Sequence, residues 1–312
     1  METMKAVRVH QYGGPEVLKY EEAPRPKPGP GEVLVRILAA GVNPMDWKVR
    51  EGQLKEALAY RMPFVPGWDV SGVVEVTGPN VTVLTTGDEV YGHPSVVRNG
   101  TYAEYAVVPE AELALKPRSV DHVHAASVPI AALTAWQGLF DAGDLHTEQK
   151  VLIHGGAGGV GSFAVQLARW KGAFITATAS GRNQEFLRNL GADLTIDYEK
   201  SRFDRLVCDV DLVFDTIGGD TLRRSWKVLK KGGILVSTVE APDDGEAEAR
   251  GVRAALVDTQ ANPAQLAEIA KLVDAGMVRP IVEAVFPLNE ARHAQELSQT
   301  GHARGKIVLK VA

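Results

Sequence analysis

The sequence predicts a two-domain α/β protein, in which a mainly β domain is followed by a doubly wound parallel sheet with helices on both faces. In the first ~120 residues, short β-rich runs are separated by Gly, Pro, Asn and Asp, which is typical of a mainly β fold. From about Ala125, short apolar runs alternate with helical patterns, as in βαβ units. With 312 residues, the chain is long enough for two hydrophobic cores.

The predicted strands of the first domain follow one another closely. An extended connection whose prolines restrict φ, APRPKPGPG (Ala23–Gly31), separates the first two predicted strands, MKAVRVHQY and EVLVRILAAGV. Further strands are expected at VSGVVEVTG, DEVYG and TYAEYAVVP. We place this domain at residues 1–125.

The second domain, at residues 126–275, is predicted from strand–helix pairs. KVLIHG precedes VGSFAVQLARWKG, AFITATAS precedes RNQEFLRNLGA, and LTIDY, DLVFDTIG, GGILVSTV and VRAALVD supply further strands. The helix NPAQLAEIAKLVDAG is expected to have Asn262 as its N-cap and Pro263 as its first residue. The tail returns to strand composition in MVRPIVEAVFPL and GKIVLKV, so we expect residues from about 276 to 312 to complete the first domain.

Composition excludes several classes of protein. The net charge is −5 and there is no dense basic run, so nucleic-acid binding is not expected. There is no signal-peptide pattern and no stretch of 18 apolar residues, so we predict a cytoplasmic protein that does not bind membranes. The single cysteine, Cys208, excludes an intramolecular disulfide and a Cys-rich zinc site.

The glycine-rich stretch HGGAGGVG (His154–Gly161) lies between a predicted buried strand and an amphipathic helix. Gly156, Gly158 and Gly161 match G-x-G-x-x-G, with Gly159 and Val160 inside the motif. In this context the pattern predicts a dinucleotide site: Gly156 for the tight turn, Gly158 for the approach of the pyrophosphate, and Gly161 for close packing of helix on strand. The free N–H groups and the dipole of the helix start attract the phosphates.

The segment after the second strand indicates which dinucleotide binds. A fold that prefers NAD usually has an Asp or Glu about 20 residues after the glycines. Here ATASGRNQE has no acid before Glu185, and Ser180 and Arg182 stand where a 2′-phosphate would lie. A guanidinium suits that dianion, so we predict NADPH as the cofactor.

Several motifs in order make nearly the whole chain resemble the medium-chain dehydrogenase/reductase superfamily, in its zinc-free quinone oxidoreductase branch. They are GPEVLKYEEAPRPKPGPGEVLVRILAAGVNPMDWKVREG, PFVPGWDVSGVVEVTG, GDEVYG, GTYAEYAVVP, HGGAGGVGSFAVQLA and GKIVLKV. The resemblance implies a GroES-like mainly β domain joined to a Rossmann domain. Zinc-dependent members have a Cys and a His where this chain has Asn43 and Trp68, so a metal-free enzyme is implied.

An enzyme of this kind has no Lewis acid to polarise a simple ketone or alcohol, which leaves hydride transfer to an electrophilic acceptor. We therefore predict an NADPH-dependent reductase of quinones. The alternative enzyme reduces the double bond of alkenals or enones with NADPH. A third possibility, from another class, is a non-catalytic, crystallin-like NADPH-binding protein.

The resemblance also implies roles for individual residues. Asn43 would lie beside the nicotinamide and ribose, Thr134 beside the carboxamide, and Tyr198 beside the adenosine phosphate. Further cofactor contacts are implied at Thr216, Ile217, Ser237, Arg304 and Lys306. Asn43, Asp46 and Tyr60 are the candidates for catalysis, and Trp47, Tyr60, Phe64 and Trp68 those for the substrate pocket. A homodimer joined near GVRAALVD is also implied.

Overall fold

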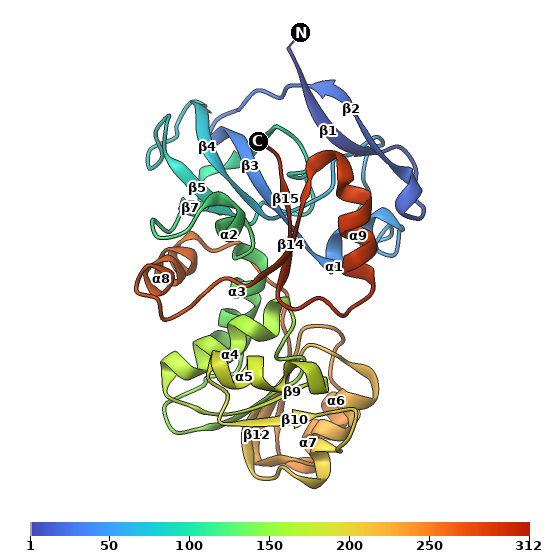
Figure 1. Cartoon of the computed structure of the whole chain (residues 1–312), viewed down its shortest axis with the longest axis vertical. Coiled ribbons are helices and arrows are strands. Elements are labelled where there is room, and N and C mark those ends of the chain that lie inside the picture. Colours follow the sequence, from blue (N-terminus) through green and yellow to red (C-terminus); the bar gives the residue numbers. More distant parts are fainter. Residues whose placement is uncertain (1) are drawn as a thin grey trace. The chain divides into compact units, whose positions relative to one another are not determined.

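The computed structural model describes residues 2–312, and the chain forms two compact units (Figure 1). The first unit comprises the chain up to Ile130 together with residues 261–276 and 280–312. The second comprises residues 131–260 and 277–279. Helix α3 (Pro129–Trp136) begins in the first unit and continues into the second.

The first unit is built on a seven-stranded sheet in the order β14-β15-β3-β4-β5-β7, with β6 also pairing with β3. A separate antiparallel pair is formed by β1 and β2. The strands are β1 (Thr3–Val9), β2 (Leu18–Pro24), β3 (Glu32–Val42), β4 (Val70–Thr77), β5 (Glu89–Gly92), β6 (Tyr105–Pro109), β7 (Leu113–Leu115), β14 (Val282–Pro287) and β15 (Lys306–Lys310).

Strand β3 organises this sheet, because it pairs with β4, β6 and β15. Its side chains Val33, Val35 and Ile37 are fully buried in one hydrophobic cluster. The C-terminal strand β15 pairs antiparallel with β3, with Ile307 opposite Val42. Residues near both ends of the chain are therefore neighbours in one sheet, drawn in red and blue in Figure 1.

The helices of the first unit lie around this sheet: α1 (Pro44–Arg50), α2 (His122–Ala126), α8 (Pro263–Asp274) and α9 (Ala291–Gln299). The predicted start of α8 is confirmed, since the side chain of Asn262 accepts the N–H of Gln265 at 3.0 Å and Pro263 is the first helical residue. Short 3₁₀ turns are η1 (Pro15–Val17), η2 (Glu110–Glu112) and η6 (Leu288–Glu290).

The second unit is the predicted doubly wound fold: six parallel strands in the order β10-β9-β8-β11-β12-β13. They are β8 (Lys150–Ile153), β9 (Phe174–Ala179), β10 (Leu194–Asp197), β11 (Val210–Asp215), β12 (Leu229–Ser237) and β13 (Arg253–Leu256). The strand order reverses between β8 and β11. In open α/β sheets, ligands bind at the carboxyl ends of the strands at such a switch point.

The π-helical turn η3 (Gln137–Ala142) precedes β8. The strands are connected by the helices α4 (Gly159–Lys171), α5 (Gln184–Leu190), α6 (Gly219–Ser225) and α7 (Asp244–Arg250) and by the 3₁₀ turns η4 (Gly181–Asn183) and η5 (Phe203–Arg205). Helix α4 ends at Gly172, whose φ of +81° closes the helix in the left-handed region. Within residues 2–312, none of the helices combines the length and the hydrophobicity that crossing a membrane requires.

Candidate functional site

The glycine-rich loop connects β8 to α4 at the switch point of the second unit. The left-handed residue is Gly155, with φ +68°, one position before Gly156, to which sequence reasoning assigned the tight turn. A Cβ on Gly161 would lie 2.2 Å from the carbonyl oxygen of Gly155, so helix α4 packs directly on the turn. A Cβ on Gly158 would meet one atom, that same oxygen, at 3.4 Å. Gly158 therefore leaves open space at the start of α4.

Helix α4 starts at this open position and has 13 residues, with Gly158 as its N-cap. The first N–H groups of a helix have no acceptor within the helix, and its dipole makes this end positive. The loop therefore has the two properties that bind a pyrophosphate: unpaired donors and room for close approach.

The neighbouring loops of the second unit expose apolar side chains at the same edge of the sheet. Tyr198 follows β10, Ile217 follows β11 and Val239 follows β12, and they are 55%, 54% and 45% exposed. Three exposed side chains of this size beside a glycine turn suit a ligand with planar rings. Sequence reasoning missed Val239, whose signal was its place directly after a buried strand.

Two predicted hydroxyl residues stabilise loops of this edge. Thr216 donates its hydroxyl hydrogen to the carbonyl oxygen of His154 at 2.8 Å, which joins the loop after β11 to the glycine loop. Ser237 is buried, and its Oγ accepts the N–H groups of Val239 and Glu240 at 3.2 and 3.3 Å. The hydroxyl of Thr134 lies 2.7 Å from that of Thr259, a neighbour that sequence reasoning did not identify.

The loop after β9 has both cations and acids near it. Ser180 precedes η4, and its Oγ accepts the side-chain amide of Asn183 at 3.2 Å, while Arg182 is exposed. The carboxylate of Glu199 accepts the N–H of Gly181 at 3.4 Å. The loop itself contains no acid before Glu185. The carboxylates of Asp197, the last residue of β10, and of Glu199 in the following turn come close to Gly181.

His154 is a buried imidazole behind the glycine loop. Its Nε2 lies 3.0 Å from Ser225 Oγ and its Nδ1 lies 3.1 Å from Thr178 Oγ1. Because the Ser225 hydroxyl donates to the carbonyl oxygen of Thr221, His154 Nε2 must be the protonated nitrogen. Burial lowers the pKa of this imidazole to about 3, and the charge of Arg224 acts in the same direction.

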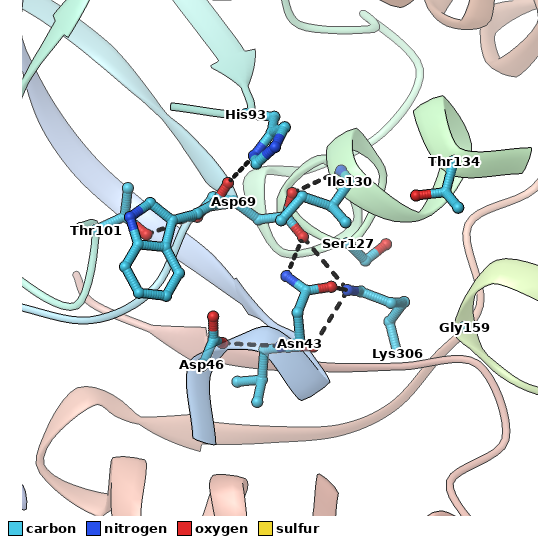
Figure 2. A network of polar contacts seen from close by, with 12 residues as sticks. Asn43, Asp46, Asp69, His93, Thr101, Ser127, Ile130, Thr134, Gly159 and Lys306 are labelled. Atoms are coloured by element: carbon cyan, nitrogen blue, oxygen red, sulfur yellow. Dashed lines mark hydrogen bonds and ion pairs between the residues drawn. The ribbon is translucent and has the colours of Figure 1, made fainter. Parts of the chain in front are cut away.

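In the first unit, a buried polar network joins β3, β4 and β15 (Figure 2). The side-chain amide of Asn43 donates to Asp69 Oδ2 at 2.8 Å, and its oxygen accepts from the ammonium of Lys306. The same ammonium donates to the carbonyl oxygen of Val42 at 3.1 Å and lies 3.3 Å from Asp69 Oδ2. The other oxygen of Asp69 accepts the N–H of Ile130 at 2.7 Å.

Asp46 lies in the first turn of α1, beside this network. Its Oδ2 accepts the N–H of Asn43 at 2.8 Å and the hydroxyl of Tyr102 at 2.7 Å. Its Oδ1 is buried and has no hydrogen-bond partner within residues 2–312. Burial raises the pKa of the Asp46 carboxyl to about 7, although both hydrogen bonds and the charge of Lys306 act in the opposite direction.

The four aromatic candidates for the substrate pocket differ in exposure. Phe64 and Trp68 are 1% and 0% exposed in a cluster of buried residues. Tyr60 is partly buried, stacks on Phe64 with ring centroids 4.4 Å apart, and donates its hydroxyl hydrogen to the carbonyl oxygen of Val96. Burial raises the pKa of the Tyr60 phenol. Trp47 is also partly buried, so Trp47 and Tyr60 are the two that reach the surface.

The residues at the positions where zinc-dependent members have a Cys and a His do not suit zinc. Asn43 and Trp68 offer no thiolate or imidazole, and the ammonium of Lys306 already occupies the oxygens of Asn43 and Asp69. The imidazole of His93, whose Nδ1 bonds to the carbonyl oxygen of Trp68 at 2.8 Å, keeps Nε2 as a possible ligand, but a single imidazole does not make a zinc site. Residues 2–312 contain no group of three or more His, Cys, Asp or Glu side chains placed to hold a metal ion.

Two domain families match the chain. Residues 29–118 match the alcohol dehydrogenase GroES-like domain, and residues 190–309 match the zinc-binding dehydrogenase family.

Similar proteins are oxidoreductases. The NADPH-dependent alkenal/one oxidoreductase of Arabidopsis thaliana is 38% identical over 98% of this chain and 79% of its own length. A chloroplast envelope quinone oxidoreductase homolog of the same organism is 30% identical over 98% of each chain. The structure of the quinone oxidoreductase of Coxiella burnetii superposes with a TM-score of 0.93, at 37% identity over the full length of both chains.

Proposed function

The chain belongs to the medium-chain dehydrogenase/reductase superfamily, in its quinone oxidoreductase branch, and from this premise we propose that it reduces quinones with NADPH and without zinc. The observation that carries the proposal is the Lys306 ammonium bound to Asn43 and Asp69, at the position where metal-dependent relatives need a thiolate and an imidazole. A reductase without a Lewis acid needs an acceptor that is already electrophilic, and a quinone is one.

We propose that NADPH is held by the loops of the second unit. The pyrophosphate would bind at Gly158 and the N–H groups of the α4 start, and the 2′-phosphate at Ser180 and Arg182. Tyr198 and Ile217 would cover the rings with their exposed apolar surface. When bound, the cofactor supplies the hydride, so the chain itself has to bind, orient and protonate.

In the first unit, we propose that Asn43 contacts the bound ligands and that Asp46 is the source of the proton. The pKa of about 7 means that Asp46 keeps a proton near neutral pH, as a general acid must. That proton would be on Oδ1, because Oδ2 already accepts two hydrogen bonds. Trp47 and Tyr60 would form the wall on which a planar acceptor stacks.

A second candidate acceptor is the conjugated double bond of an alkenal or enone. It is favoured by the 38% identity to the Arabidopsis alkenal/one oxidoreductase, a relative that matches nearly the whole chain. Both acceptors need the same hydride geometry. A non-catalytic NADPH-binding protein would retain the glycine loop and show no turnover.

The decisive experiment follows NADPH absorbance with one quinone, one enal and one enone, and the reverse reaction with NADP and one simple alcohol. We expect rapid oxidation of NADPH by the quinone, unaffected by a chelator. A higher kcat/KM with the enone would transfer the proposal to the second candidate. Oxidation of the alcohol at a good rate, or stoichiometric zinc whose removal abolishes activity, would overturn it.

We also propose a homodimer joined along β13. This strand is the last one of the six-stranded sheet, and Leu256 at its end is 49% exposed. An edge strand with free N–H and C=O groups can pair with a second copy of itself. The N–H of Val257 bonds to Ser237 of β12, so Ala255 also faces β12 and the N–H of Ala254 faces the free edge. Ala254→Pro removes one of these outward donors, so it is expected to convert a dimer to a monomer in light scattering.

A further inference from the structure

The ammonium of Lys306 is buried in the first unit, where an unpaired charge would be costly. Lys306 is 4% exposed and Asp69 is 0% exposed. The ammonium has three hydrogens and three acceptors around it: the carbonyl oxygen of Val42, Asn43 Oδ1 and Asp69 Oδ2. All of its donors are therefore engaged inside the protein, and none is left to bind a ligand.

These contacts determine the orientation of the Asn43 amide, that is, the directions in which its oxygen and its NH₂ group point. An ammonium can only donate, so the atom of Asn43 that it contacts must be the oxygen. An ionised carboxylate can only accept, so the atom that contacts Asp69 must be the NH₂ group. Figure 2 shows the amide lying between Lys306 and Asp69, with its oxygen toward the first and its nitrogen toward the second.

One hydrogen of the Asn43 NH₂ group bonds to Asp69. No bond of the second hydrogen is found within residues 2–312, so this hydrogen is the one that a ligand would accept. The cation on the amide oxygen draws electron density away from the nitrogen, because bonded polar groups polarise one another in a low-dielectric environment. That second N–H is therefore a stronger donor than the amide of an isolated asparagine.

We infer that Lys306, together with Asp69, is a positioning residue that turns the Asn43 amide into a fixed, polarised donor for the carbonyl oxygen of the acceptor. This inference rests on the proposed function. Addition of hydride to a quinone or enone moves an electron pair of the accepting double bond onto that oxygen, and a proton then neutralises it. A donor already oriented toward this oxygen stabilises the charge as it develops.

The experiment compares two double variants, each of which removes one negative and one positive charge. In D69N/K306M both charges are removed together, so no unpaired charge is buried, but the Asn43 amide has lost both the cation and the carboxylate. The control, E89Q/K116M, neutralises another buried lysine of the same unit, whose ammonium donates to the carbonyl oxygens of Pro117 and Val120 and lies 3.6 Å from Glu89. We expect D69N/K306M to lower kcat about tenfold or more, with the Kd for NADPH within twofold of wild type. The control should keep the wild-type kcat.

Two further readouts separate positioning from a purely structural role. In an N43A background, D69N/K306M should lower kcat by less than twofold, because the residue through which the pair acts is already absent. Thermal unfolding requires no activity: K306M alone should melt well below wild type, because it leaves Asp69 buried and charged, and D69N/K306M should recover most of that loss.

The outcomes distinguish this inference from the function on which it rests. Three kinetic outcomes would each overturn the inference alone. They are a wild-type kcat in folded D69N/K306M, an equal loss of kcat in the control, and a tenfold loss of kcat that persists in the N43A background. Melting of K306M at the wild-type temperature would do the same. A wild-type protein that turns over no quinone, enal or enone would overturn the proposed function and this inference together.

Discussion

Substituting alanine at two glycines of one loop, Gly158 and Gly161, is expected to separate cofactor binding from folding. At Gly158 the new methyl group meets one atom at 3.4 Å, an ordinary contact, and φ −78° with ψ −177° is accessible to alanine. At Gly161 the methyl group would lie 2.2 Å from the carbonyl oxygen of Gly155. Because an ordinary contact of a methyl carbon begins at 3.4 Å, helix α4 must move by about 1 Å.

The two variants therefore differ in what they change. G161A overpacks the contact between helix and turn, which costs about 2 kcal/mol in the free energy of unfolding, or roughly 4–8 °C in Tm. G158A should change Tm by less than about 2 °C, since the site has room. In the proposed binding mode its methyl group points into the space of the pyrophosphate, so the Kd for NADPH should rise at least about tenfold, or 1.4 kcal/mol.

The assay pairs differential scanning fluorimetry without ligand with titration of NADPH followed by protein fluorescence. The result that would refute the reasoning is a G158A protein that binds NADPH within twofold of wild type, because the open space at Gly158 would then not be where the phosphates lie. A G161A protein with unchanged Tm would refute the packing part of the argument.

Three further predictions concern charge and pH. R182A should weaken NADPH binding about tenfold and NADH binding less than twofold, measured by titration. Asp46 has a pKa of about 7 in the folded protein, above the ordinary 3.8, so it binds more protons when folded. Its contribution to the free energy of unfolding is therefore present below about pH 4 and is lost as the pH rises to about 7. Urea unfolding of D46N should not show that loss. His154 behaves in the opposite way: its folded pKa of about 3 makes stability fall as pH drops below about 6.5, and H154Q should remove that fall.

The second unit could be predicted well from the sequence because its signals are local. Strands β8, β9, β11 and β12 are short apolar runs that each precede a helix, and the glycine loop lies between two such elements, so neighbours in the sequence are neighbours in space. The acids at the loop after β9 could not be found in this way. Glu199 lies in the turn after β10, and parallel pairing of β10 with β9 brings that turn to Gly181.

The network of Asn43, Asp69 and Lys306 could not be predicted from the sequence for the same physical reason, because strand pairing brings together residues that are far apart in the chain. Asn43 and Lys306 are 263 positions apart, and their contact depends on the register in which β15 pairs with β3. With Ile307 opposite Val42, Lys306 falls beside Asn43 at the end of the pair. A slip by one residue would turn Lys306 toward the other face of the sheet, since side chains alternate along a strand. The apolar side chains Ile307 and Leu309, buried in the core on their face, therefore also place the ammonium, and a charge needed at the site is held by hydrophobic packing.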